Sequence, residues 1–249
     1  MNIREALREG ERLLATAGSD EAELEAELLL RHALDIDRVH LYQRLTDDLP
    51  PEPHAAYRAL LDRRRAHEPT AYILGHREFF GLEFEVTPAA LIPRPETEIL
   101  VELAIAFARE RFGGGPFVLA DIGVGCGAIA VAIARELPGA DVIAIDLSKR
   151  ALALARRNAH RHGVEERIRF VHGDLLEPLE SAHPEPAPGA SRGPSRRVDI
   201  IAANLPYVRT ADWRATPPEI REHEPRRALD GGADGLKLIR RLVDQAPAY

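Results

Sequence analysis

Residues 117–127 of this 249-residue chain read FVLADIGVGCG, and they are the strongest indication of its fold class. Its first six residues form an apolar run of the length of a buried strand, and helical spacing follows over Ala128–Leu137. Three alternating glycines between them let the backbone approach a ligand closely, and the N-terminus of the helix offers free N–H groups. The stretch therefore predicts a strand, a loop and a helix that bind a nucleoside cofactor.

Downstream of this unit the sequence alternates between strands and helices. Strand-like runs at Asp141–Asp146, Ile168–His172 and Val198–Ala203 accompany helical spacing over Ser148–His162. The alternation is typical of an α/β fold with a parallel sheet covered on both faces. Between the last two strands, residues 181–197 are rich in Pro, Ala, Gly and Ser and are predicted to form a disordered loop.

Upstream, residues 1–75 are predicted to form a small helical bundle. Its second helix is expected to begin at Asp20 as N-cap and to turn one apolar set toward the core, namely Leu24, Leu28 and Ala33. Residues 79–86 alternate between apolar and polar about a glycine, which predicts a β-hairpin. We therefore expect a helical domain over 1–75, a hairpin linker over 76–95 and an α/β domain over 96–249.

The glycine loop leaves two cofactors open. Gly123, Gly125 and Ala128 satisfy the dinucleotide pattern G-x-G-x-x-A, and Asp146 stands at the end of the next strand, where a carboxylate accepts ribose hydroxyls. Both NAD and S-adenosylmethionine have that ribose. Asp121 and the third glycine, Gly127, favour S-adenosylmethionine, because its ammonium group suits a neighbouring carboxylate and a pyrophosphate does not.

A second polar group follows the third strand of this series, where Asp174 is predicted to accept a hydrogen bond from the adenine amine or, alternatively, to cap a loop. The fourth strand ends in Asn204-Leu205-Pro206-Tyr207. Ligands of open α/β sheets bind beyond the carboxyl ends of the strands, so this tetrapeptide is expected beside the glycine loop.

Asn204-Leu205-Pro206-Tyr207 resembles the (N/D)PPY-type motif of methyltransferases that act on planar amino nitrogens. Residues 69–75, 77–81 and 91–98, with 224–229 and 232–236 downstream, resemble the release-factor glutamine methyltransferase family (HemK/PrmC). The similarity extends over about residues 1–246. Methyltransferases of nucleic acid bases share the tetrapeptide but not the upstream blocks.

This resemblance implies a class I, Rossmann-like S-adenosylmethionine-dependent methyltransferase domain behind an N-terminal substrate-recognition domain. The implied reaction is N5-methylation of the glutamine in the Gly-Gly-Gln loop of peptide chain release factors. Transferred residue by residue, the cofactor-binding residues are Asp121, Gly123, Val124, Gly125, Cys126, Gly127, Asp146, Asp174, Leu175 and Asn204, and the substrate clamp is Asn204, Leu205, Pro206 and Tyr207.

Within this clamp, the Asn204 side-chain oxygen and the Leu205 carbonyl are expected to accept the two N–H bonds of the substrate amide. Tyr207 is expected to pack on the amide plane, although an aromatic residue there could also belong to the core. No metal is required by this chemistry.

The chain departs from the family pattern at three places. Val124 stands where the family has Thr or Ser, and Leu205 stands where it has the first proline. The chain also reaches Tyr249 directly after a helix, so we expect the C-terminal strands of the family's seven-stranded sheet to be missing and the methyltransferase domain to be incomplete. On that expectation the strand before Asn204 lies near a sheet edge.

Composition narrows the function classes further. The formal charge of −7 argues against a protein that coats nucleic acid, and Cys126, the single cysteine, excludes an internal disulfide and a cysteine-based zinc site. The charged N-terminus and the lack of long apolar runs indicate a soluble cytoplasmic protein. The basic run Arg63–Arg65 could contact a release factor or ribosomal RNA, but a solvated helix face is the preferred interpretation.

Three other functions remain as alternatives. An adenine-N6 methyltransferase of DNA or RNA would use the same clamp but predicts a basic cleft. An NAD-dependent oxidoreductase would use the glycine loop and leave Asn204–Tyr207 without a role. A non-catalytic cofactor-binding module is the third.

Overall fold

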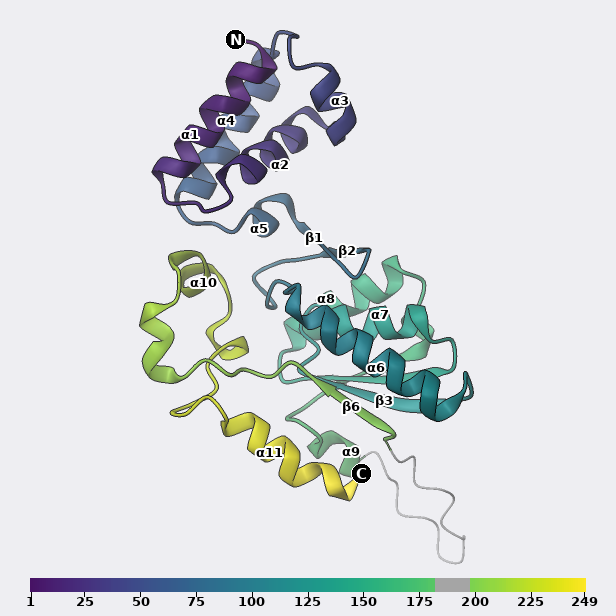
Figure 1. The fold of residues 1–249 in the computed structure, drawn as a ribbon. Helices are drawn as coiled ribbons and strands as arrows, with labels where there is room; N and C mark the ends of the chain where they lie inside the picture. Colours follow the sequence, from purple (N-terminus) through teal and green to yellow (C-terminus); the bar gives the residue numbers. More distant parts are fainter. Residues whose placement is uncertain (182–197) are drawn as a thin grey trace, which may run out of the picture. The chain divides into compact units, whose positions relative to one another are not determined.

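The computed structural model describes residues 1–181 and 198–249 (Figure 1). Contacts divide these residues into two units, Met1–Gly75 with Pro217–His223, and His76–Thr216 with Glu224–Tyr249. The predicted loop over residues 181–197 lies, apart from its first residue, outside the described residues. Among the described residues, no helix has both the length and the apolar character needed to cross a bilayer.

The first unit is a helical bundle, as predicted. Its core contains Ile3, Leu14, Leu30, Tyr57 and Leu61, each at most 1% exposed. Its helices are α1 (Ile3–Thr16), α2 (Ala22–Leu34), α3 (Arg38–Gln43), α4 (Pro51–Arg65), α5 (Thr70–Leu74) and α10 (Pro218–His223).

The buried face of α2 differs from the predicted one. Leu24 is 46% exposed, and the N-cap is Glu21 with no side-chain cap, not Asp20. Glu25 is buried in place of an apolar residue because its carboxylate accepts hydrogen bonds from Arg64 Nε (2.8 Å) and Thr70 Oγ1 (2.8 Å). A buried charge that is paired and hydrogen-bonded is tolerated inside a protein, so hydropathy alone misassigns this face.

The basic run in α4 is only in part a solvated face. Arg63 and Arg65 are exposed and pair with Glu68 and Asp62. Arg64 is buried, with 9% of its side chain exposed, and bonds Glu219 of α10 (2.7 Å) as well as Glu25. The preferred interpretation is therefore wrong for Arg64, whose charge is used inside the unit.

The second unit begins with the predicted β-hairpin, which consists of β1 (His76–Phe79) and β2 (Leu82–Glu85) paired antiparallel. The turn residues Phe80 and Gly81 both have left-handed φ values, 54° and 68°. Such two-residue turns match the twist of paired antiparallel strands.

A four-stranded parallel sheet forms the centre of this unit, in the order β5-β4-β3-β6. Its strands are β3 (Phe117–Ile122), β4 (Ala140–Asp146), β5 (Ile168–His172) and β6 (Ile200–Ala203). The remaining helices are α6 (Glu96–Phe112), α7 (Ala128–Glu136), α8 (Lys149–Arg161), α9 (Glu177–Ser181) and α11 (Lys237–Gln245), with short 3₁₀ turns at Glu165–Arg167, Thr210–Ala215, Arg226–Ala228 and Ala246–Ala248.

Both faces of the sheet are covered, as the apolar strands predict. Leu119 and Val142 face one core with α6, α7 and α8, whereas Ile122 and Ile145 face a second core with Leu176 and residues of α11 (Figure 1). Because β3, β4 and β6 run parallel, their carboxyl ends bring the glycine loop, Asp146 and Asn204 to one edge of the sheet.

Candidate active site

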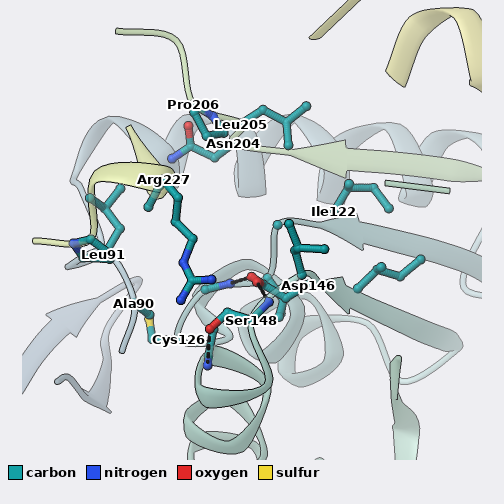
Figure 2. Close-up of a pocket in the computed structure, with 18 of the residues that line it drawn as sticks. Ala90, Leu91, Ile122, Cys126, Asp146, Ser148, Asn204, Leu205, Pro206 and Arg227 are labelled. Atoms are coloured by element: carbon teal, nitrogen blue, oxygen red, sulfur yellow. Dashed lines mark hydrogen bonds between the residues drawn. The ribbon is translucent and has the colours of Figure 1, made fainter. Parts of the chain in front are cut away.

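A cavity of roughly 300 Å³ lies at the carboxyl ends of the strands in the second unit (Figure 2). Its size is at the lower end of small-molecule sites. The predicted site residues that line it are Gly123, Val124, Gly125, Cys126, Asp146, Asp174, Leu175, Asn204, Leu205 and Pro206. The parallel topology therefore brings the predicted cofactor loop and the predicted clamp to the same space.

Asp146 is held in place by the backbone. Its Oδ2 accepts a hydrogen bond from Gly125 N (3.0 Å) and its Oδ1 accepts one from Ser148 N (2.7 Å). Burial raises its pKa above the ordinary aspartate value, against the opposing effects of these two N–H groups and of the Arg227 charge. Each carboxylate oxygen has a further lone pair, so Asp146 can also accept hydroxyl hydrogens from a ligand in the cavity.

The glycine loop is anchored to the neighbouring strand, because Gly123 N and Val124 N both donate to the Ile145 carbonyl oxygen (2.8 and 3.1 Å). Gly127 does not line the cavity. Its φ is 90°, and a Cβ there would lie 3.1 Å from the Ala155 Cβ. This glycine is therefore explained by backbone conformation and by the close approach of α8.

Asp121 is fully buried and does not line the cavity. Its Oδ2 accepts a hydrogen bond from Ala130 N (3.0 Å), while its Oδ1 has no partner among the described residues. Burial raises the pKa of Asp121 to about 7. The structure thus places this carboxylate away from the cavity wall, with one acceptor oxygen unused.

Asn204 follows β6 and lines the cavity. Its Nδ2 donates a hydrogen bond to Thr97 Oγ1 (3.0 Å), which leaves Oδ1 as the amide atom for other partners. Leu205 is buried with its side chain in the core between the sheet and α11. Tyr207 is 63% exposed and does not line the cavity.

Asp174 also lines the cavity, and it forms an ion pair with Arg241 (Oδ2 to Nη2, 3.0 Å). One of its oxygens is therefore already engaged. Leu175 is buried and has a left-handed φ of 48°, which is uncommon for a bulky side chain and is typical of functional loops.

Sequence reasoning missed several residues of this site. Figure 2 shows the Arg227 side chain extending from the Asn204 side of the cavity toward Asp146. Arg94 pairs with the buried Glu224 and thereby fixes the cavity wall before α6. Thr97, the partner of Asn204, lies in the block 91–98, so this block was the available signal for Thr97. Arg227 lies in the block 224–229, so that block was the available signal for Arg227.

Comparison with known proteins gives a consistent result along the chain. Residues 5–75 match the PrmC N-terminal domain and residues 119–223 match a methyltransferase domain. This second match, on a parallel sheet with a glycine loop after its first strand, confirms the class I S-adenosylmethionine-dependent methyltransferase fold.

Three curated relatives are each named release factor glutamine methyltransferase. The protein of Geobacter sulfurreducens is 46% identical over 99% of this chain and 80% of its own length. Those of Moorella thermoacetica and Cereibacter sphaeroides are 40% and 41% identical, over 99% and 100% of this chain and 81% and 82% of their own lengths. The family resemblance predicted from the motifs is confirmed, and the chain belongs to the release factor glutamine methyltransferase family.

Proposed function

We propose that this chain transfers the methyl group of S-adenosylmethionine to the side-chain nitrogen, N5, of the glutamine in the Gly-Gly-Gln loop of peptide chain release factors. The observation that carries the proposal is that Asn204 and Asp146, at the ends of two parallel strands, line one cavity. Asn204 supplies a hydrogen-bond acceptor for the substrate amide, and Asp146 supplies one for the ribose of the cofactor. The proposed substrate is inferred from the name of the relatives, release factor glutamine methyltransferase.

The residues around the cavity fit S-adenosylmethionine. Asp146 is anchored by Gly125 N and Ser148 N and has acceptor capacity left for the ribose hydroxyls. Asp174 and Leu175 are proposed to bound the adenine, and the glycine-loop residues that line the cavity, 123–126, to pass beside the methionine moiety. Oδ1 of Asp121, which has no hydrogen-bond partner among the described residues, is proposed to interact with the ammonium group of the methionine moiety, either across the glycine loop or by way of a bridging water. When bound, this cofactor supplies an electrophilic methyl group on a sulfonium.

The chain's own contribution to the reaction is orientation. An amide nitrogen is a poor nucleophile because its lone pair is delocalised into the carbonyl. We propose that Asn204 Oδ1 and the Leu205 carbonyl accept its two N–H bonds, which aims the nitrogen into the cavity and stabilises the positive charge that grows on it. Pro206 would stiffen the backbone of this clamp, and the exposed Tyr207 would pack on the amide once the substrate is seated.

The alternatives account for less of the molecule. An oxidoreductase that binds NAD would leave Asn204 without a role in the reaction. A non-catalytic binding module would leave the hydrogen-bonded pair of Thr97 and Asn204 without a role. An adenine methyltransferase would use the clamp, but the formal charge of −7 and the named relatives favour a protein substrate.

The helical unit is the proposed substrate-recognition part of the protein. This proposal assigns residues 1–75 to release factor binding, 76–95 to a linking hairpin and 96–249 to methyl transfer, except that the segment Pro217–His223 belongs to the helical unit. A contact of the exposed Arg63 or Arg65 with ribosomal RNA would be compatible with it. Since release factors act on ribosomes, the proposed location is the cytoplasm.

The direct test incubates the protein with methyl-labelled S-adenosylmethionine and a purified release factor, followed by mass spectrometry of the Gly-Gly-Gln peptide. We expect one methyl group on the glutamine and none on a release factor that has glutamate at that position. Label transferred to an adenine-containing oligonucleotide but not to the release factor would replace this proposal with the nucleic acid alternative.

A further inference from the structure

We propose that Thr97 is a positioning residue, which orients the Asn204 side chain so that its oxygen faces the substrate amide. The inference rests on the function proposed above, because it assigns a partner to the clamp. It starts from one contact in the cavity wall, where Asn204 Nδ2 donates to Thr97 Oγ1 at 3.0 Å. Both residues line the cavity.

Thr97 lies on a well-anchored element. It belongs to the first turn of α6, where its N–H donates to the Arg94 carbonyl (3.0 Å). In the same turn, Glu98 accepts a hydrogen bond from Phe80 N of the hairpin turn (2.8 Å). Arg94 is itself paired with the buried Glu224. The hydroxyl therefore comes from a helix fixed on several sides, whereas Asn204 follows the end of a strand.

The chemistry of the clamp needs this constraint. The final torsion of an asparagine side chain is broad, so the amide can present either its oxygen or its nitrogen to the cavity. A substrate amide brings two N–H donors, and an Asn204 Nδ2 in that place would set donor against donor. With Nδ2 held by Thr97 Oγ1, the acceptor Oδ1 is the atom left for the substrate.

Two other features of the pair support a positioning role. Its members are 107 residues apart in the chain, so the bond depends on the fold of the whole second unit. Two arginines that line the cavity are already paired and so do not compete with a substrate for the Asn204 oxygen. Arg94 is paired with Glu224, and Arg241 is paired with Asp174. The Arg227 side chain extends toward Asp146 instead (Figure 2).

The test compares Thr97→Val, which keeps the shape and removes the hydroxyl, with Thr97→Ser, which keeps the hydroxyl. We expect Thr97→Val to lower the single-turnover methylation rate about tenfold, the effect of one lost hydrogen bond of ordinary strength. Its affinity for S-adenosylmethionine should stay within about twofold of that of the parent protein, and Thr97→Ser should restore most of the rate. A Thr97→Ser protein as slow as Thr97→Val would overturn the inference.

An Asn204→Ala background separates this inference from the function it rests on. If Thr97 acts through Asn204, adding Thr97→Val to Asn204→Ala should slow the reaction no further. Fully additive losses would contradict the positioning role while leaving the clamp intact. An Asn204→Ala protein with the parent rate would instead remove the clamp itself. If Thr97→Val folds poorly in a thermal melt, Thr97→Ala supplies the same comparison.

Discussion

The side-chain amide of Asn158 donates a hydrogen bond of 2.8 Å to the carbonyl oxygen of Cys126, in the middle of the glycine loop. The same side chain bonds both backbone groups of Glu85 in β2, accepting from its N–H (2.8 Å) and donating to its carbonyl (3.0 Å). Asn158 is completely buried. One side chain of α8 thus connects the hairpin to the loop that lines the cavity.

Replacing Asn158 with alanine should therefore weaken both fold and cofactor site. One buried backbone group, the Cys126 carbonyl, and two part-buried groups of Glu85 would lose their partner. The cost is about 1–3 kcal/mol for a buried group left unsatisfied and less where water can reach. We expect a loss of several kcal/mol in the free energy of unfolding and weaker binding of S-adenosylmethionine. The neighbouring Arg157→Ala, which breaks an exposed ion pair with Glu85, is the control and should cost at most about 1 kcal/mol. Equal stability of the two variants would contradict this assignment.

The raised pKa of Asp146 predicts a pH dependence of cofactor binding. The carboxylate form accepts the ribose hydroxyls, and its fraction falls as the pH drops through the pKa. Affinity should therefore decline on acidification at a higher pH than an ordinary aspartate would give. Asp146→Ala should weaken binding by about 1.5–3 kcal/mol for each charged hydrogen bond lost. Calorimetric titration from neutral pH down to the ordinary aspartate range measures both effects, and Asp146→Ala should show the smaller pH dependence.

Asp121 predicts a pH dependence of stability in the cofactor-free protein. Its pKa is about 7 in the folded state against 3.8 for the free side chain, so between these values the folded state holds more protons than the unfolded one. The free energy of unfolding should fall as the pH rises from about 4 to about 7 and then level off. The total decline is about 1.4 kcal/mol for each unit by which the folded-state pKa exceeds that of the free side chain. Asp121→Asn should remove this decline. Denaturant unfolding at pH 5 and pH 8 should show the larger gain for the variant at pH 8, and equal gains would count against a buried acid.

The two kinds of arginine in α4 should differ in their effect on stability. Arg64→Ala would leave the Glu25 carboxylate buried without its main partner, which costs about 3–5 kcal/mol for pairs of this kind. Arg65→Ala removes only an exposed pair with Asp62 and should change stability by at most about 1 kcal/mol. Urea unfolding of both variants tests the difference. Similar small losses would mean that Arg64 is solvated after all.

The sequence predicts the sheet of the second unit closely because each strand is a short apolar run between turn residues. β3, for example, is expected and observed at Phe117–Ile122. The gathering of Asp146 and Asn204 also follows, since parallel strands share one carboxyl edge. What the sequence does not predict depends on partners far along the chain. Glu25 is buried by Arg64, 39 residues away, and Thr97 meets Asn204 across 107 residues. No local pattern encodes such pairs.

The proposed role of Asn204 is best tested by single-turnover methylation of a release factor by Asn204→Ala, with cofactor affinity measured alongside. Because the Asn204 oxygen is proposed to strengthen its bond as charge develops on the substrate nitrogen, the rate should fall on the order of 10²-fold while the affinity for S-adenosylmethionine changes little. Leu205→Pro is the matched variant and should remain nearly as active as the parent protein, since it keeps the carbonyl. An Asn204→Ala protein that methylates at the parent rate would contradict the account and return residues 204–207 to a simple turn after β6.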